Sequence, residues 1–216
     1  MTSERDKIFS AIRRSTGQTH GSTATAPAKP TPPAPPRRVA GKPAEELLAI
    51  WTGLLRDQGA GVEIADGPDR VPAAVAGLLD GWQLPRIVRM GTDPALTCLD
   101  WQAAGLEAET GPAIFGDTAA VSKAIAGIGE VGAVMLASGP DNPVTLAFVP
   151  EAHIVVMNRS DLVACYEDAW ERLRTGDPHG PPRTVNLIAG PSRTADIGGR
   201  PVLGAHGPRY FAVVAF

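Results

Sequence analysis

Apolar residues recur along the chain with two periods, one typical of helices and one of strands. The clearest helix is residues 44–57, where four leucines and Trp51 recur every three or four positions. The helical segments are residues 44–57, 69–79, 94–104 and 117–128, the last with Asp117 or Thr118 as its N-cap. Short apolar runs of strand length separate them, at residues 61–65, 85–90 and 106–109. This alternation predicts an α/β domain built on a largely parallel sheet.

The rhythm changes after Gly129. Three apolar runs, residues 131–137, 145–149 and 153–157, are joined by spacers too short to hold helices. A helix is expected at residues 159–174, followed by neighbouring strands at residues 185–189 and 210–216. The predicted fold class is therefore α/β, a mostly parallel sheet with helices on both faces and an antiparallel segment in the C-terminal half.

The first 43 residues differ from the rest. Residues 1–16 predict a short amphipathic helix with Ile8, Phe9 and Ile12 on one face. Residues 17–42 are rich in proline, alanine and threonine, which favours an extended linker. We therefore expect an N-terminal arm and linker, residues 1–43, and one α/β domain, residues 44–216. The arm could dock on another protein, but packing on its own or a neighbouring subunit is favoured.

Composition excludes several classes of protein. A 216-residue chain with 44% hydrophobic residues can bury a full core. The net charge of −3 shows no basic excess, so nucleic acid is not an expected partner. No apolar run reaches the ~18 residues of a membrane span, and the N-terminus lacks a signal-like apolar region, so a cytoplasmic location is expected. An unpaired sheet edge and a detached arm are compatible with a homodimer.

Two cysteines occur, Cys98 and Cys165, and they form no CxxC pair. They cannot supply the four thiolates of an iron–sulfur cluster, so any redox metal is expected in a partner protein. Both fall among apolar neighbours in predicted helices, which favours packing over a nucleophilic role.

Polar residues gather in two loops near the C-terminus. The first, residues 190–196, follows a predicted strand, and the second, residues 204–209, precedes the last one. We expect both loops to open onto one pocket. The candidate ligand-binding residues are Gly190, Ser192, Thr194, Asp196, Gly207 and Arg209. The hydroxyls and backbone N–H groups of the first loop could hold an anion, or could form an ordinary network of turn hydrogen bonds.

Glu130 and His206 are the candidate catalytic residues. Glu130 lies between two glycines, so it could act as a general base, or it could cap a helix or pair with an arginine. His206 lies between two small-residue turns, where an acid–base imidazole or a structural plug would both fit. His153 begins an apolar strand and is expected to be a buried, hydrogen-bonded core residue. The spacing of these groups encodes no local metal motif, so no metal site is expected.

Five motifs in one order resemble the LUD domain of lactate utilization C proteins, the LutC/YkgG family. They are Gly-Glu-Val-Gly-Ala at 129–133, Ser-Gly-Pro at 138–140, Pro-Glu-Ala-His at 150–153, Gly-Pro-Ser-Arg-Thr-Ala-Asp-Ile at 190–197 and Gly-Ala-His-Gly-Pro-Arg at 204–209. The resemblance implies a fold of the NagB/RpiA/CoA-transferase kind. It also implies a role in oxidising L-lactate to pyruvate, beside two partner proteins that carry iron–sulfur clusters.

The chain departs from this family pattern at two places. Gly198 stands where the family commonly shows a glutamate after Asp196-Ile197, and Val131 and Ala133 replace residues that often include a hydroxyl. A carboxylate and a hydroxyl are therefore missing. If those groups bind a ligand in relatives, the site here is weaker or different; if they are only caps, little changes.

Three functions remain open at this point. The resemblance implies a non-cluster component of a lactate-oxidising system that binds a small anionic ligand and docks on iron–sulfur proteins. The alternatives are a free-standing isomerase or transferase that uses Glu130 and His206, and an assembly or regulatory module with a vestigial pocket; whether the chain is itself an enzyme stays open. In each active case, Glu130, Ser192, Thr194, Asp196 and His206 are expected to converge at the carboxyl ends of the sheet strands.

Overall fold

A computed structural model describes residues 4–15, 39–176, 182–196 and 199–216. Its contacts divide the chain into two units, Met1–Ala34 and Pro35–Phe216, which are described separately. The first unit contains helix α1 (Glu4–Ser15), which confirms the predicted N-terminal helix. Its apolar side chains Ile8, Phe9 and Ile12 are 58, 42 and 50% exposed. The predicted linker lies mostly outside the described residues.

A six-stranded sheet forms the centre of the second unit. Its strands, in spatial order, are β1 (Gly61–Ile64), β12 (Tyr210–Ala215), β7 (Ala152–Met157), β4 (Ala119–Lys123), β2 (Ile87–Met90) and β3 (Glu107–Thr110). Every neighbouring pair is parallel. All six amino ends therefore meet at one edge of the sheet and all six carboxyl ends at the other.

Helices α3 (Val71–Trp82) and α4 (Pro94–Thr97) cover one face of this sheet. The buried side chains of α3 recur at helical spacing, and they pack with Leu96 of α4 against alternate residues of the strands. A short 3-10 turn (Pro68–Arg70) leads into α3. This face holds the larger of the apolar clusters.

The opposite face carries α2 (Ala44–Asp57) and a second sheet. The second sheet has the order β8 (Leu162–Val163), β5 (Ala126–Ile128), β6 (Ala133–Ala137) and β9 (Val185–Ile188), with antiparallel β5–β6 and β6–β9 pairs. Helix α5 (Tyr166–Gly176) packs on its outer side.

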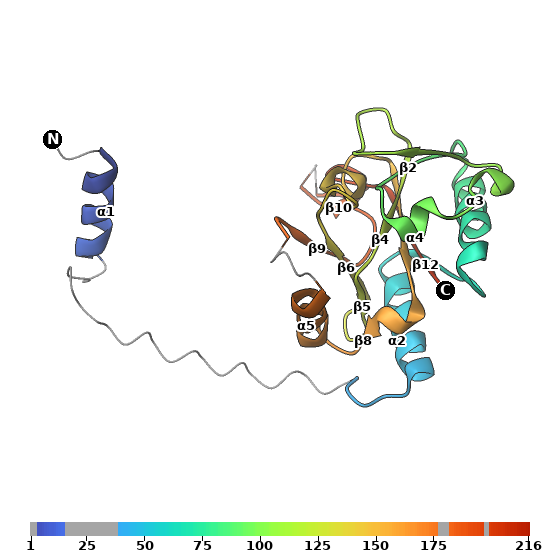
Figure 1. The fold of residues 1–216 in the computed structure, drawn as a ribbon, viewed down its shortest axis with the longest axis horizontal. Coiled ribbons are helices and arrows are strands. Elements are labelled where there is room, and N and C mark those ends of the chain that lie inside the picture. Colours follow the sequence, from blue (N-terminus) through green and yellow to red (C-terminus); the bar gives the residue numbers. More distant parts are fainter. Residues whose placement is uncertain (1–3, 16–38, 177–181, 197–198) are drawn as a thin grey trace. The chain divides into compact units, whose positions relative to one another are not determined.

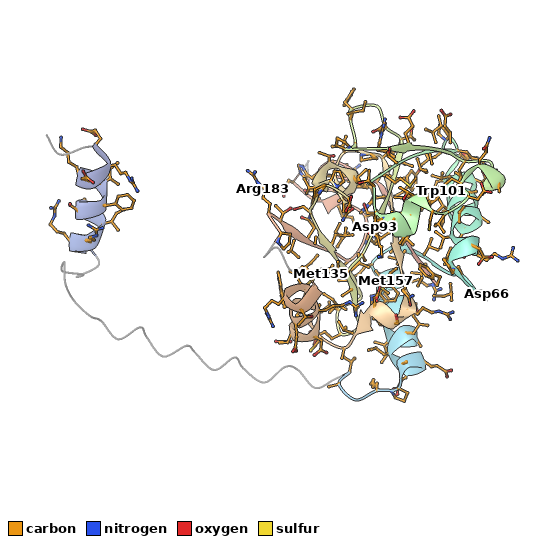
Figure 2. The ribbon with its side chains drawn as sticks, viewed as in Figure 1. Asp66, Asp93, Trp101, Met135, Met157 and Arg183 are labelled. Atoms are coloured by element: carbon orange, nitrogen blue, oxygen red, sulfur yellow. The ribbon has the colours of Figure 1, made fainter. Side chains whose placement is uncertain are left out.

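The second unit is thus layered, from α5 through the four-stranded sheet to the six-stranded sheet and α3 (Figure 1). Met157 packs between the two sheets, whereas Met135 packs on the α5 side of the smaller one (Figure 2). The predicted fold class is confirmed, with its parallel sheet, helices on both faces and antiparallel segment.

The helix predicted at residues 117–128 is wrong, because this segment forms β4 and β5. Ala119, Ala120 and Val121 are buried between layers on both faces of the sheet. A strand covered on both faces is apolar at every position and loses the alternation that distinguishes it from a helix.

Three other predicted elements need correction. Residues 94–104 form only α4 and a 3-10 turn at Gln102–Ala104. Residues 145–149 are not a strand, because a 3-10 turn (Val144–Ala147) follows Pro143. The predicted helix at 159–174 begins only at Tyr166. A 3-10 turn (Arg159–Asp161) and β8 precede it, and the Asn158 side chain caps the turn by accepting the backbone N–H of Ser160.

The two C-terminal strands, expected to be neighbours, belong to different sheets. β9 pairs only with β6 in the four-stranded sheet, and β12 lies between β1 and β7 in the six-stranded one. A small antiparallel hairpin, β10 (Arg193–Thr194) and β11 (Val202–Leu203), lies between them in the chain. The motif loops therefore span the passage from one sheet to the other.

Candidate functional site

The two motif loops meet at Ser192. Its backbone N–H donates to the carbonyl of Pro208 at 2.9 Å, and its carbonyl accepts from the N–H of Gly204 at 2.9 Å. The Ser192 hydroxyl oxygen accepts from the backbone N–H of His206 at 3.3 Å. Four residues of the two loops are thus joined by three hydrogen bonds, which fix the position of His206 relative to the first loop.

The first motif loop is also held against the end of α2. A Cβ atom on Gly190 would lie 2.8 Å from the carbonyl oxygen of Gln58, so only glycine allows this approach. The Gln58 side-chain amide donates to the carbonyls of Val131 and Gly132, at 3.1 and 3.2 Å. The turn that carries Glu130 and the turn at Gly190 therefore pack on the same helix end.

An open cleft of about 620 Å³ lies beside the second motif loop. His206, Gly207 and Arg209 line it, together with residues 115–118 and 148–151. These segments directly precede β4, β7 and β12. The cleft therefore lies at the amino ends of the parallel strands, and the expectation that the motif loops gather at the carboxyl ends is wrong. We call it the amino-end cleft.

The rim of the amino-end cleft is apolar. Phe115 is fully exposed, and Phe148, Val149 and Leu203 are each more than 40% exposed. Large apolar side chains grouped around the opening of a cleft are unusual on a protein surface, and such groups mark binding surfaces. Polar side chains lie among them, so the cleft presents both kinds of group.

Arg209 is the cation that lines the amino-end cleft among the described residues. Its guanidinium lies 4.0 Å from the carboxylate of Glu151 and 5.4 Å from the centre of the Tyr210 ring. Both members of this ion pair are about half exposed, so their attraction is weak and easily exchanged for a ligand. His206 is exposed beside it.

Asp117, at the same cleft, has a structural role. Arg89 donates to both of its carboxylate oxygens at 3.0 Å, and the N–H of Ile114 donates to one of them at 2.8 Å. The hydrogen bond from Arg89 lowers the pKa of Asp117 below its usual value. The carboxylate is engaged in holding the loop at residues 114–117 onto β2.

Glu130 lies elsewhere. Its carboxylate accepts the backbone N–H of Tyr166 at 3.1 Å, at the first residue of α5. It is not among the described residues that line the amino-end cleft. The helix-capping interpretation accounts for this contact, and the structure does not bring Glu130 and His206 into one cleft.

Thr194 and Asp196 also stay outside the amino-end cleft among the residues that the structure describes. The Thr194 hydroxyl accepts from the N–H of Asp196 at 3.2 Å, a local bond within the turn. Ser192 contacts the second loop as described above. The polar groups of the first loop thus form a turn network, the second of the two interpretations left open. Position 198, where glycine replaces the usual glutamate, lies outside the described residues.

His153 is fully buried between the sheets, as expected. Its Nε2 atom lies 3.0 Å from the Ser122 hydroxyl, and its ring packs 5.8 Å from that of Phe211. Its Nδ1 atom has no partner among the described groups, so only one ring nitrogen is satisfied. Burial lowers the pKa of His153 to about 3, and the ring is neutral at physiological pH.

The cysteines differ from each other. Cys165 is buried, as expected, and burial raises the pKa of its thiol to about 11. Cys98 is exposed, so its predicted packing role is wrong. Within residues 4–15, 39–176, 182–196 and 199–216, no group of three or more His, Cys, Asp or Glu residues is arranged to hold a metal ion. Over the same ranges, no helix is long and apolar enough to cross a membrane.

A second cleft, of about 340 Å³, lies at the opposite edge of the sheet. Asp93, which follows β2, and Lys123, the last residue of β4, line it together with Arg172 of α5. We call it the carboxyl-end cleft. The sequence interpretation misses it because it predicts a helix at residues 117–128, and that helix hides the strand end at Lys123. The available signal was a charged residue within three positions of the end of each apolar run, Asp93 after Met90 and Lys123 after Val121.

Known proteins resemble this chain in sequence and in fold. An uncharacterised protein of Neisseria meningitidis is 39% identical over 97 residues, 45% of this chain and 41% of that protein. Lactate utilization protein C of an Exiguobacterium species is 32% identical over 110 residues, 50% of this chain and 47% of that protein. The chain thus aligns with about half the length of these relatives.

A crystal structure of a DUF162 family protein from Deinococcus radiodurans matches 81% of this chain and 98% of its own, with a TM-score of 0.61 and 19% identity. That likeness supports the fold. The sequence pattern of the LUD domain matches residues 45–216, which include both clefts and all five motifs. The chain belongs to the LUD domain family.

Proposed function

We propose that this protein is a non-cluster component of an L-lactate utilization system. The proposal is supported by membership of the LUD domain family and by relatives named lactate utilization protein C. In this role the chain binds a small anionic ligand and docks on iron–sulfur proteins that carry the electrons. Two cysteines, one buried and one exposed, cannot hold a cluster within the chain.

One observation carries the proposal: Ser192 of the first motif loop binds the second motif loop, and the second motif loop lines the amino-end cleft. The hydrogen bonds hold the second motif loop, with His206 and Arg209, at the cleft and connect it to the first. A guanidinium and an imidazole there, Arg209 and His206, are suited to holding a carboxylate through charge-assisted hydrogen bonds.

The apolar rim suits the docking part of the role. Phe115, Phe148, Val149 and Leu203 expose large side chains around the same cleft. Aromatic side chains of this kind commonly anchor protein interfaces, because burying each one removes much apolar surface from water. The isomerase or transferase alternative is less well supported, because it needs Glu130 and His206 in one cleft.

The test is reconstitution of lactate-dependent dye reduction with the purified partner proteins. Arg209→Gln and His206→Ala should each lower the rate by about tenfold or more, since each removes a charge-assisted contact with the anion. Arg183→Gln is the matched control and should leave the rate unchanged, because Arg183 (labelled in Figure 2) is exposed and is not among the described residues that line the amino-end cleft. An unchanged rate in all three variants would exclude this cleft from the function.

A further inference from the structure

The carboxyl-end cleft lies where the two sheets join. After β4 the chain passes from one sheet to the other: the N–H of Ala124 donates to Val156 of β7, and the N–H of Ile125 donates to Met135 of β6. Helix α5 closes the far wall. Open parallel sheets bind ligands outside the carboxyl ends of their strands, because loops diverge there and leave a crevice. The position alone makes this cleft a candidate site.

Its charged groups are held in pairs. The Lys123 ammonium lies 3.8 Å from one carboxylate oxygen of Asp93, and the other oxygen accepts the N–H of Ala95 at 2.9 Å. Arg172 donates from Nε to the carbonyl of Ile125 at 2.7 Å and also pairs with Asp161. The formal charges of the two cations and two carboxylates cancel.

The two cations keep hydrogen-bonding capacity despite these pairings. Each oxygen of Asp93 already has a partner, whereas the Lys123 ammonium has a single long ion pair among the described contacts. The Arg172 guanidinium likewise carries more N–H groups than its two bonds use. Both cations therefore keep N–H groups beyond their described contacts, and a ligand that satisfies these groups must supply acceptor oxygens.

The walls between these charges are apolar. Ala124, Ile125, Ala137 and Leu173 line the cleft, and its volume is at the small end of the range for ligand sites. A doubly charged anion would be repelled by both aspartates, and a purely polar one would leave the apolar walls uncovered. A single carboxylate on a short apolar body matches both features.

We propose that the carboxyl-end cleft binds a small organic carboxylate with one negative charge, its oxygens held by Lys123 and Arg172. The short apolar body of the ligand lies against Ile125 and Leu173. Among the residues that the structure describes, this site shares no lining residue with the amino-end cleft. The inference goes beyond the proposed function and does not depend on it.

The experiment is a titration of the full chain with butanoate, acetate and inorganic phosphate, followed by NMR chemical shifts. Butanoate should bind in the millimolar range or tighter, with acetate and phosphate weaker, because only butanoate covers the apolar walls. Lys123→Gln should weaken butanoate binding by about tenfold. Lys42→Gln is the matched control, since Lys42 has a similar exposure and also pairs with a carboxylate.

A second variant covers the case in which Lys123→Gln disturbs folding. Ala137→Leu leaves every charge in place and fills part of the cleft, so it should also weaken butanoate binding. Phosphate binding as tightly as butanoate would overturn the proposal, as would unchanged affinity in both variants. Loss of butanoate binding in His206→Ala would instead assign the carboxylate to the amino-end cleft.

Discussion

The two edges of the six-stranded sheet offer different kinds of binding surface. At the amino ends the cleft is wide, about 620 Å³, with an exposed apolar rim and a weakly paired arginine. At the carboxyl ends it is about 340 Å³, and ion pairs alternate with apolar walls. The second motif loop lines the wide cleft, where a partner could bury the rim, whereas the smaller cleft matches the size of a metabolite. The two edges of one sheet therefore differ in size and in exposed apolar surface, and each needs its own test of binding.

The largest expected effect concerns the buried packing around Trp51, which supports both clefts. Trp51 of α2 is fully buried, and its indole N–H donates to the carbonyl of Ala133 in β6 at 2.9 Å. Trp51→Ala should lower the free energy of unfolding by about 3–5 kcal/mol, because it leaves a cavity between the sheets. Urea denaturation measures the loss, with Trp51→Phe as a milder control. If a severely destabilised variant binds at one cleft as tightly as the unchanged protein does, binding at that edge of the sheet does not depend on the packing around Trp51.

Acidic pH should lower the stability of the same buried region between the sheets, which contains His153. The pKa of His153 is about 3 when folded against about 6.5 when unfolded, so the unfolded chain takes up the proton first. Stability contributed by the neutral ring is complete above pH ~6.5 and falls progressively towards pH ~3, by a few kcal/mol. Below about pH 3.8 the stability should fall further, because Asp117 has a lowered pKa in the folded chain and the unfolded chain takes up this proton first.

Thermal melts between pH 7 and pH 4 measure this dependence. His153→Gln keeps a polar group near Ser122 but cannot titrate, so its melting temperature should vary less with pH over that interval. Equal pH profiles for the two proteins would rule out His153 as the source.

A substitution with a smaller effect on stability should distinguish binding at the amino-end cleft from binding at the carboxyl-end cleft. Gly190→Ala places a Cβ 2.8 Å from the Gln58 carbonyl, so the first motif loop must shift, at a cost of about 1–3 kcal/mol. Partner binding at the amino-end cleft should weaken while butanoate binding is retained. Gly139→Ala is the control, since no atom lies within 4 Å of its added Cβ. Equal losses at both clefts would mean that the edges are coupled.

The smallest effect concerns the two proposed catalytic residues. Glu130→Ala removes the cap of α5 and should cost about 1 kcal/mol, whereas His206→Ala, at an exposed site, should change stability by less than about 0.5 kcal/mol. Lactate-dependent activity should show the reverse order, with His206→Ala the more harmful. If Glu130→Ala abolishes activity while the protein stays folded, Glu130 acts in chemistry rather than as a cap.

Local patterns predicted some elements well and failed at others for a physical reason. Helix α2 has the bounds expected from its apolar spacing, because one of its faces is buried and the other exposed. β4 was mistaken for helix because both of its faces are covered. The error propagated to the site, since the edge on which a loop lies depends on strand direction and order.

The candidate residues show the same limit. His206 and Arg209 were identified from turn composition, and both line a cleft. The contact between Glu130 and the start of α5 joins residues 36 positions apart, which no local spacing encodes. Lys123 and Arg172 gain their shared cleft only when β4 and α5 pack on the second sheet. Such sites depend on tertiary contacts between distant segments.

The conformation of the loop that carries Phe115 does not depend on the Phe115 side chain. Asp117 holds the loop through Arg89 and the N–H of Ile114, and Gly116 supplies a left-handed turn at φ 102°. Phe115 itself is fully exposed, so replacing it removes no buried surface. Its side chain can therefore change during evolution, or in the laboratory, with little effect on folding. Position 115 is a natural place to attach a fluorophore or crosslinker that reports on whatever approaches this edge of the protein.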